Sequence, residues 1–168
     1  MPSTEAPKKR KRRKPRKPTN SKVPAKGRLR DMADQLWSLA VRSDWSNRCA
    51  VCGNGKCEAH HLVPRQHQAT RYALENGVAL CAGCHKFDKN ISPHLNAAAW
   101  LEWLRDHWPI RHAWYIANPR PTFDGVVTPA YYCGVILNLK QYVEEADFDR
   151  IVGVKFGRYL EDEFEAKQ

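Results

Sequence analysis

Two Cys-x-x-Cys pairs constrain the fold of this chain more than any other feature. The pairs are separated by 28 residues. Each pair can bind one zinc ion through a tight turn, and two pairs complete a tetrahedral site. Zinc binding contributes roughly 10–16 kcal/mol in small domains, which is enough to fold a segment with little core of its own. We therefore predict a structural zinc site formed by Cys49, Cys52, Cys81 and Cys84.

Two further cysteines, Cys57 and Cys133, fall outside these pairs. Cys133 is most simply a free thiol, whereas Cys57 lies close enough in sequence to replace one of the zinc ligands, and this alternative stays open. No apolar stretch approaches about 18 residues, so no membrane span is expected. The basic N-terminal segment is not followed by an apolar region, so the chain is expected to be cytoplasmic and not secreted, in a reducing setting that disfavours disulfides.

Positive charge is concentrated at the N-terminus. The net charge is +10, but residues 1–30 alone hold 13 basic residues and one acidic residue. The other 138 residues hold 15 basic and 17 acidic residues, a net charge of −2. Because residues 1–27 are rich in proline and almost free of apolar side chains, we expect a disordered basic tail.

A basic run this dense attracts phosphate groups electrostatically without reading nucleotide sequence. We predict that the tail contacts nucleic acid, although a solubilising tail or a nuclear localisation signal would have the same composition. The predicted contacts are Lys8, Lys9, Arg10, Lys11, Arg12 and Arg13.

The body of the chain has the pattern of an α+β fold, with a small metal-organised module between helices. Residues 28–44 have helical spacing of apolar side chains, and residues 93–108 do so again, with Asn96 as a candidate N-cap and Pro109 as a stop signal. Helical spacing also places three tryptophans on the second helix, where we expect core packing: Trp100, Trp103 and Trp108.

The C-terminal part has a weaker pattern. Residues 109–130 are proline-rich and are expected to be loop, and residues 131–146 suggest a helix that Gly134 weakens. The last segment is ambiguous between short strands and a helix. We therefore expect residues 109–168 to be a partly helical extension.

Three histidines bracket the cysteine pairs: His60, His61 and His85. Neighbouring side chains in a strand point to opposite faces, so His60 and His61 should have different roles. His60 could turn towards His85 and hold a second metal with open coordination positions, while His61 stays free beside it.

The stretches "CAVC", "HHLVPR" and "ENGVALCAGCH", in this order, resemble the HNH endonucleases, also called ββα-metal nucleases, and most of all the phage-encoded subgroup with zinc knuckles. The likeness covers about residues 30–108, and we expect a nuclease domain with its flanking helices over residues 28–108. It implies two strands near residues 59–63 and 77–80, followed by a helix from about residue 84.

The resemblance also implies roles for individual residues. His60 and His85 would bind the catalytic ion, His61 would be the general base, and Asn76 would tie the loop between the strands and help to orient the base. Many members carry a further histidine at the position of Lys89, so the third protein ligand stays open between His67 and His94. Arg65 and Arg71 flank the loop and are candidate phosphate contacts.

The implied activity is metal-dependent hydrolysis of DNA phosphodiester bonds, by nicking or double-strand cleavage, in the cytoplasm of a phage-infected bacterium. The implied ion is Mg²⁺ or Mn²⁺, although imidazole ligands also suit Zn²⁺ and Ni²⁺. RNA is an open alternative substrate. The rival interpretations are a non-catalytic zinc-ribbon DNA-binding protein and a protein-interaction domain. The sequence leaves the oligomeric state open.

Overall fold

A single long helix organises the molecule. The computed structural model describes residues 23–119 and 121–164, so the predicted phosphate contacts of the tail lie outside the described residues. Helix α1 spans Lys26–Asp44, which confirms the helix predicted over residues 28–44 and begins inside the range assigned to the tail. Its buried stripe includes Leu29, Leu36 and Val41, while Leu39 is only half-buried.

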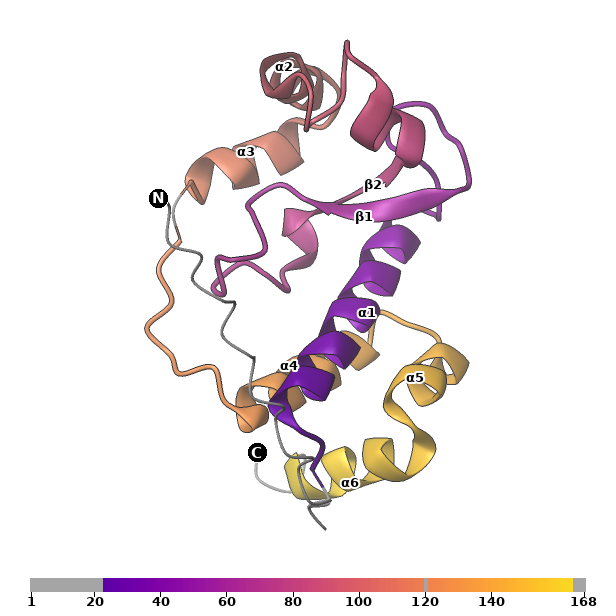
Figure 1. Cartoon of the computed structure of the whole chain (residues 1–168), viewed down its shortest axis with the longest axis vertical. Coiled ribbons are helices and arrows are strands. Elements are labelled where there is room, and N and C mark those ends of the chain that lie inside the picture. Colours follow the sequence, from indigo (N-terminus) through magenta and orange to yellow (C-terminus); the bar gives the residue numbers. More distant parts are fainter. Residues whose placement is uncertain (1–22, 120, 165–168) are drawn as a thin grey trace, which may run out of the picture.

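A two-stranded antiparallel sheet lies at the C-terminal end of α1 (Figure 1). Strand β1 spans Cys57–His61 and strand β2 spans Gly77–Cys81, with His61 opposite Gly77 in the register. Every residue of β2 is buried. A Cβ atom at Gly77 would lie 2.2 Å from the Val41 side chain, so the absence of a side chain lets β2 approach α1 closely.

Two short turns flank β2. A 3-10 turn at Leu74–Asn76 (η1) precedes it, and a single π-helical turn at Gly83–Phe87 (η2) follows it. The helix predicted from about residue 84 is therefore only this turn. The chain leaves the helical conformation at Asp88, whose φ and ψ of −76° and 111° are extended.

Helices α2, Ala97–His107, and α3, Pro109–Ala117, follow in an angled pair. The Asn96 side chain accepts a hydrogen bond from the Ala99 amide, which confirms the predicted cap. Pro109 follows the end of α2, but it is also the first residue of α3, a position that proline favours because its missing N–H is not needed there. The prediction of loop from residue 109 was therefore wrong for Pro109–Ala117.

The three tryptophans predicted for the core differ in burial. Trp100 is buried and Trp103 is partly buried. Trp108 is 41% exposed and packs edge-on against Trp45, at the end of α1, with 4.4 Å between ring centroids. Trp108 is thus a surface residue, contrary to the prediction, because the chain turns between α2 and α3 at this point.

The C-terminal part is helical throughout its regular structure: α4 at Pro129–Lys140, α5 at Glu145–Val152 and α6 at Val154–Phe164. Thr128 caps α4 by accepting a hydrogen bond from the Tyr131 amide, so this helix begins and ends earlier than the predicted 131–146. Gly134 lies in its interior. Gly153, with φ of +86°, separates α5 from α6, which resolves the ambiguity of the last segment in favour of helix.

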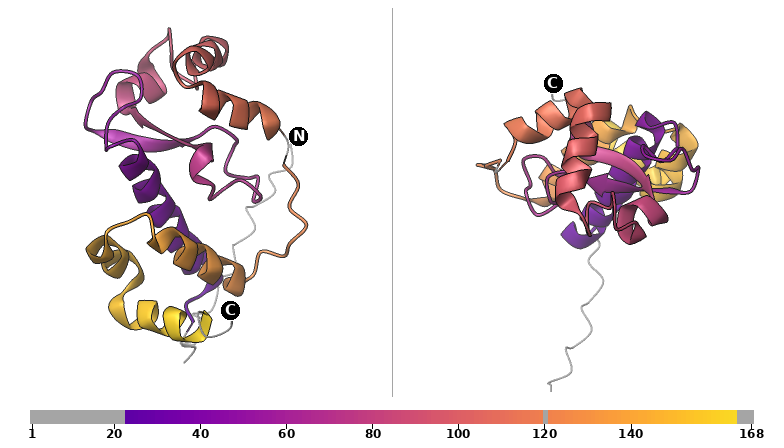
Figure 2. Two further views of the ribbon diagram at one scale, coloured as in Figure 1. Left: turned by 180° about the vertical axis from the view of Figure 1, so that it is seen from behind. Right: turned by 90° about the horizontal axis from the view of Figure 1, so that it is seen from above.

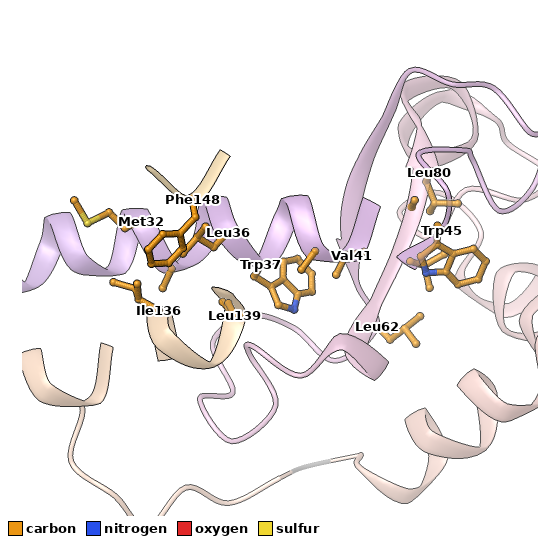
Figure 3. Packing of buried hydrophobic residues seen from close by; sticks show 14 of the residues in the cluster. Met32, Leu36, Trp37, Val41, Trp45, Leu62, Leu80, Ile136, Leu139 and Phe148 are labelled. Atoms are coloured by element: carbon orange, nitrogen blue, oxygen red, sulfur yellow. The ribbon is translucent and has the colours of Figure 1, made fainter. Parts of the chain in front are cut away.

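One hydrophobic cluster connects these parts. Helices α4 and α5 pack on α1, and α6 packs on α4 and α5, away from the hairpin (Figure 2). The cluster contains Ile136 and Phe148 of these helices as well as Leu80 of β2 (Figure 3). The predicted boundary between residues 108 and 109 therefore does not separate two cores. None of the described helices has the length and apolar character needed to cross a membrane.

Candidate metal centres

The four predicted zinc ligands lie together. The Sγ atoms of the two Cys-x-x-Cys pairs all lie within 4.8 Å of one another, and those of Cys52 and Cys81 are 3.6 Å apart. Two sulfurs bound to one tetrahedral zinc ion would be separated by about 3.8 Å. All six cysteines are free, and Cys57 is outside the cluster, so it is not the substitute ligand that the sequence left open. The cluster could hold a structural metal such as zinc.

Local backbone geometry shapes each cysteine pair. Gly53 follows the first pair with φ of +73°, a conformation that favours glycine. In the second pair the Cys84 amide points at the Cys81 sulfur, 3.5 Å away. This pair lies at the junction of β2 with the π-helical turn, so its sulfurs are placed by the sheet on one side and the turn on the other.

The thiols in the cluster differ in how readily they ionise. Although burial acts to raise it, hydrogen bonds from the backbone of Cys81, Cys52 and Val51 lower the pKa of the Cys49 thiol to about 7. Burial and the adjacent thiols raise the pKa of Cys84. One thiolate thus opposes ionisation of its neighbours, and a bound cation would relieve this repulsion.

A second cluster consists of imidazole rings from three segments. His60 is in β1, His85 is in the π-helical turn, and His94 is in the loop before α2. The Nε2 atom of His85 lies 3.0 Å from His60 Nδ1 and 3.0 Å from His94 Nε2. Two imidazole nitrogens bound to one ion at about 2.1 Å would lie about 3.0 Å apart in an octahedral site and about 3.4 Å apart in a tetrahedral one. These three residues could hold one metal ion.

The tautomer of His85 supports this arrangement. Its Nδ1 atom lies 3.1 Å from Glu58 Oε2, and a carboxylate only accepts, so Nδ1 carries the proton. Burial lowers the pKa of His85, although Glu58 opposes this effect. When the ring is neutral and Nδ1 carries the proton, the one lone pair is at Nε2. One lone pair cannot satisfy both neighbouring rings by hydrogen bonding, whereas an ion among them could be bound by all three. Histidines that bind a metal through one ring nitrogen typically donate the N–H of the other nitrogen to a carboxylate.

The loop that carries His94 is tied to the turn that carries His85. The Ser92 hydroxyl is completely buried and donates to the His85 carbonyl at 2.6 Å. The same oxygen accepts from the His94 amide at 3.2 Å. The His94 backbone is therefore held beside His85, and its exposed side chain could supply the third ligand that Lys89 leaves open. His67, the other candidate, is outside the cluster.

His61 has different surroundings from His60, as the strand geometry predicted. Its ring stacks on Trp37 with 3.7 Å between centroids, and its Nε2 atom lies 3.0 Å from the Arg71 carbonyl oxygen. Because a carbonyl only accepts, Nε2 carries the proton and Nδ1 carries the lone pair. Burial is the main reason that the pKa of His61 is lowered to about 4, so this ring is neutral near pH 7.

Asn76 holds the loop between the strands but does not reach the cleft. Its side chain is completely buried. The Oδ1 atom accepts from the Val63 amide at 2.6 Å, and Nδ2 donates to the carbonyls of Val63 and Thr70, both at 3.0 Å. The expected tying role agrees with this geometry. Because the side chain is buried, it is placed to hold the loop and not to contact a ligand in the cleft.

A cleft of about 500 Å³ brings the two imidazole environments together. His60 and His61 both line it, since β1 ends at His61, and Arg65 is exposed at its edge. Apolar side chains of the α2–α3 region form the other wall: Pro93, Ala97, Leu101 and Tyr115.

Of the two predicted phosphate contacts that the structure describes, Arg65 and Arg71, the geometry argues against Arg71. Its side chain is 9% exposed, and its guanidinium is bound to the Asp34 carboxylate with Nη2–Oδ2 at 2.7 Å. The group is therefore not available to a phosphate. No sequence pattern predicts this pairing, because Asp34 lies 37 residues earlier in the chain.

Comparisons with known proteins add no relative. No protein-family model matches the chain, and neither a curated protein nor a solved structure is significantly similar to it.

Proposed function

We propose that this protein is a metal-dependent endonuclease of the HNH type that hydrolyses phosphodiester bonds in DNA. The observation that carries the proposal is the presence of two distinct imidazole environments in one cleft. Three rings bring their nitrogens within 4.8 Å of one another, while His61 lies beside them with its own orienting partners. A non-catalytic zinc ribbon needs only the cysteine cluster and would leave this second arrangement without a role.

His60, His85 and His94 are the proposed ligands of the catalytic ion. A divalent ion held there would offset negative charge on the scissile phosphate and on the leaving 3′ oxygen. Three imidazole donors favour Zn²⁺ or Ni²⁺, whereas Mg²⁺ prefers oxygen ligands, so His94 changes the order of preference among the ions considered from sequence.

His61 is the proposed general base. The Arg71 carbonyl holds its Nε2–H, which leaves Nδ1 to accept a proton from the attacking water. The ring is neutral near pH 7, so the lone pair is available. General-base catalysis contributes roughly 10²–10⁴-fold in rate. Arg65, exposed at the edge of the cleft, is the proposed phosphate contact of this region, and the products would carry 5′-phosphate and 3′-hydroxyl ends.

The test is nicking of supercoiled plasmid DNA by the full chain with Zn²⁺, Ni²⁺, Mn²⁺ or Mg²⁺ supplied separately. We expect cleavage with at least one ion, and a rate about 10²–10⁴-fold lower for His61→Ala. His67→Ala is the matched control, because His67 lies in the connection that follows His61 and is outside both the cysteine and the histidine cluster. Zinc content should stay the same in both variants.

Cleavage by His61→Ala at the wild-type rate would show that the base is another group. DNA binding by the wild-type protein without cleavage under any ion would favour the zinc-ribbon alternative.

A further inference from the structure

The orientation of His61 depends on a segment with almost no regular structure. Its Nε2–H is held by the backbone carbonyl of Arg71, which lies in the connection between β1 and β2. A carbonyl in such a connection is a reliable partner only if the connection itself is held in place. The structure shows how this is done on the side of the connection nearest α1.

The Arg71 side chain anchors its own backbone to α1. Its Nε and Nη2 atoms donate to Asp34 Oδ1 at 3.1 and 2.9 Å, and Nη2 also donates to Oδ2 at 2.7 Å. The Nη1 atom donates to the Arg65 carbonyl at 2.8 Å, at the other end of the same loop. The Tyr72 hydroxyl donates to Asp34 Oδ1 at 3.0 Å. The carboxylate is therefore the centre of a network that closes the loop.

This ion pair is shielded from water on the arginine side. The Arg71 side chain is 9% exposed and that of Asp34 is 34% exposed. Removal of the carboxylate would leave a buried guanidinium without its counter-charge, which is far more disruptive than the loss of a surface ion pair. The loop would then move to bring the guanidinium to water, and the Arg71 carbonyl would move with it.

Helix α1 fixes a second feature of the same ring. Trp37 lies three residues after Asp34, so both side chains project from one face of the helix. Trp37 stacks flat on His61, with 14° between the ring planes, and its Nε1–H donates to the Ala73 carbonyl at 3.0 Å. Trp37 therefore sets the plane of the imidazole ring. The Asp34–Arg71 pair places the carbonyl that binds Nε2–H of the same ring.

We infer that Asp34, on a helix outside the hairpin, is a positioning residue for His61: by holding the Arg71 guanidinium it fixes the carbonyl that selects the Nε2–H tautomer. The catalytic consequence rests on the proposed function, because it assumes that His61 is the base. The structural consequence, a single tautomer of His61, does not depend on any activity.

The first experiment measures the tautomer of His61 by ¹⁵N NMR in the full chain, in the wild type and in Asp34→Ala and Asp34→Asn. The wild type should show Nε2–H alone, Asp34→Ala should show a mixture of both tautomers, and Asp34→Asn should lie between them because its amide oxygen still accepts. Asp31→Asn is the matched control, since Asp31 lies on the same helix with a side chain that is 61% exposed. It should behave as the wild type.

The second experiment measures plasmid nicking by the same variants. We expect kcat to fall roughly 10–100-fold in Asp34→Ala, the scale of a small misplacement of a catalytic group, with KM and the affinity of the histidine cluster for Ni²⁺ unchanged. Arg71→Lys should show the same pattern, because an ammonium group cannot replace the bidentate contact.

A purely structural role would lower the melting temperature but would leave the His61 tautomer unchanged, and that result would overturn the inference. If Asp34→Ala does not fold, the comparison of Asp34→Asn with Asp31→Asn decides. If no variant cleaves DNA under any ion, the proposed function fails, but the tautomer measurement still tests the role of Asp34.

Discussion

At the scale of the residue, each histidine of the cleft is defined by what its two ring nitrogens face. Glu58 accepts a hydrogen bond from Nδ1–H of His85, and the Arg71 carbonyl accepts one from Nε2–H of His61. The first arrangement presents a lone pair to two other imidazoles, and the second leaves a lone pair on Nδ1 of a ring that lines the cleft. The same side chain is therefore suited to binding a metal ion in one place and to accepting a proton in the other.

His94 is the residue whose assignment changes most between sequence and structure. We predict that His94→Ala weakens binding of Ni²⁺ at the histidine cluster by at least about 10–100-fold, which is the effect of losing even an indirect partner of a metal ligand. Titration calorimetry on protein already loaded with zinc at the cysteines would measure this loss. His67→Ala should bind Ni²⁺ as the wild type does. Equal affinity in His94→Ala would exclude it as a ligand.

At the scale of the element, the cysteine cluster joins the segment before β1 to the end of β2 and the turn that follows it. The first pair precedes β1, while Cys81 ends β2 and Cys84 lies in the π-helical turn. The turn also carries His85. A metal ion at the cysteines would therefore position a ligand of the other cluster.

We predict that Cys84→Ser lowers zinc content and loosens the hairpin, because zinc binding and folding are coupled in such a site. Amide hydrogen exchange at Val78, Ala79 and Leu80 should become faster. Cys57→Ser is the control, since Cys57 lies at the start of β1 outside the cluster. Full protection of β2 in zinc-depleted Cys84→Ser would show that the hairpin does not need the metal.

At the scale of the whole molecule, charge and chemistry are separated along the chain. The basic residues concentrate in residues 1–30, whereas the remaining 138 residues carry a net charge of −2. A body of this charge has little general attraction for a polyanion. The proposed function therefore places the affinity for DNA in the tail and the hydrolysis in the cleft.

We predict that deletion of residues 1–22, which leaves α1 intact, weakens DNA binding and flattens its dependence on salt. If 6–10 cations of the tail met phosphates, the affinity of the full chain would fall roughly 10³–10⁵-fold between 50 and 200 mM salt. Binding measured by fluorescence anisotropy over this range tests the assignment. Hydrolysis of a small phosphodiester should be retained, and an unchanged salt slope would exclude contact of the tail with DNA.

The sequence by itself determined what depends on neighbours along the chain. The cysteine pairs, helix α1, the cap at Asn96 and the divergence of His60 from His61 follow from spacing of a few residues, because turns, helices and strands have fixed periods. Pro109 shows the limit of such signals: it ends one helix and begins the next, and only the packing of the following residues distinguishes these outcomes.

Only the tertiary structure decided which distant groups meet. His94 reaches His85 because Ser92 joins their backbones, and Arg71 turns away from the cleft because Asp34 of α1 lies beside it. Neither contact has a periodic signal, since each depends on how a loop folds back on a helix or a turn. The ligand set and the orientation of the proposed base are therefore properties of the packed molecule, whereas the residue types that make them are visible in the sequence.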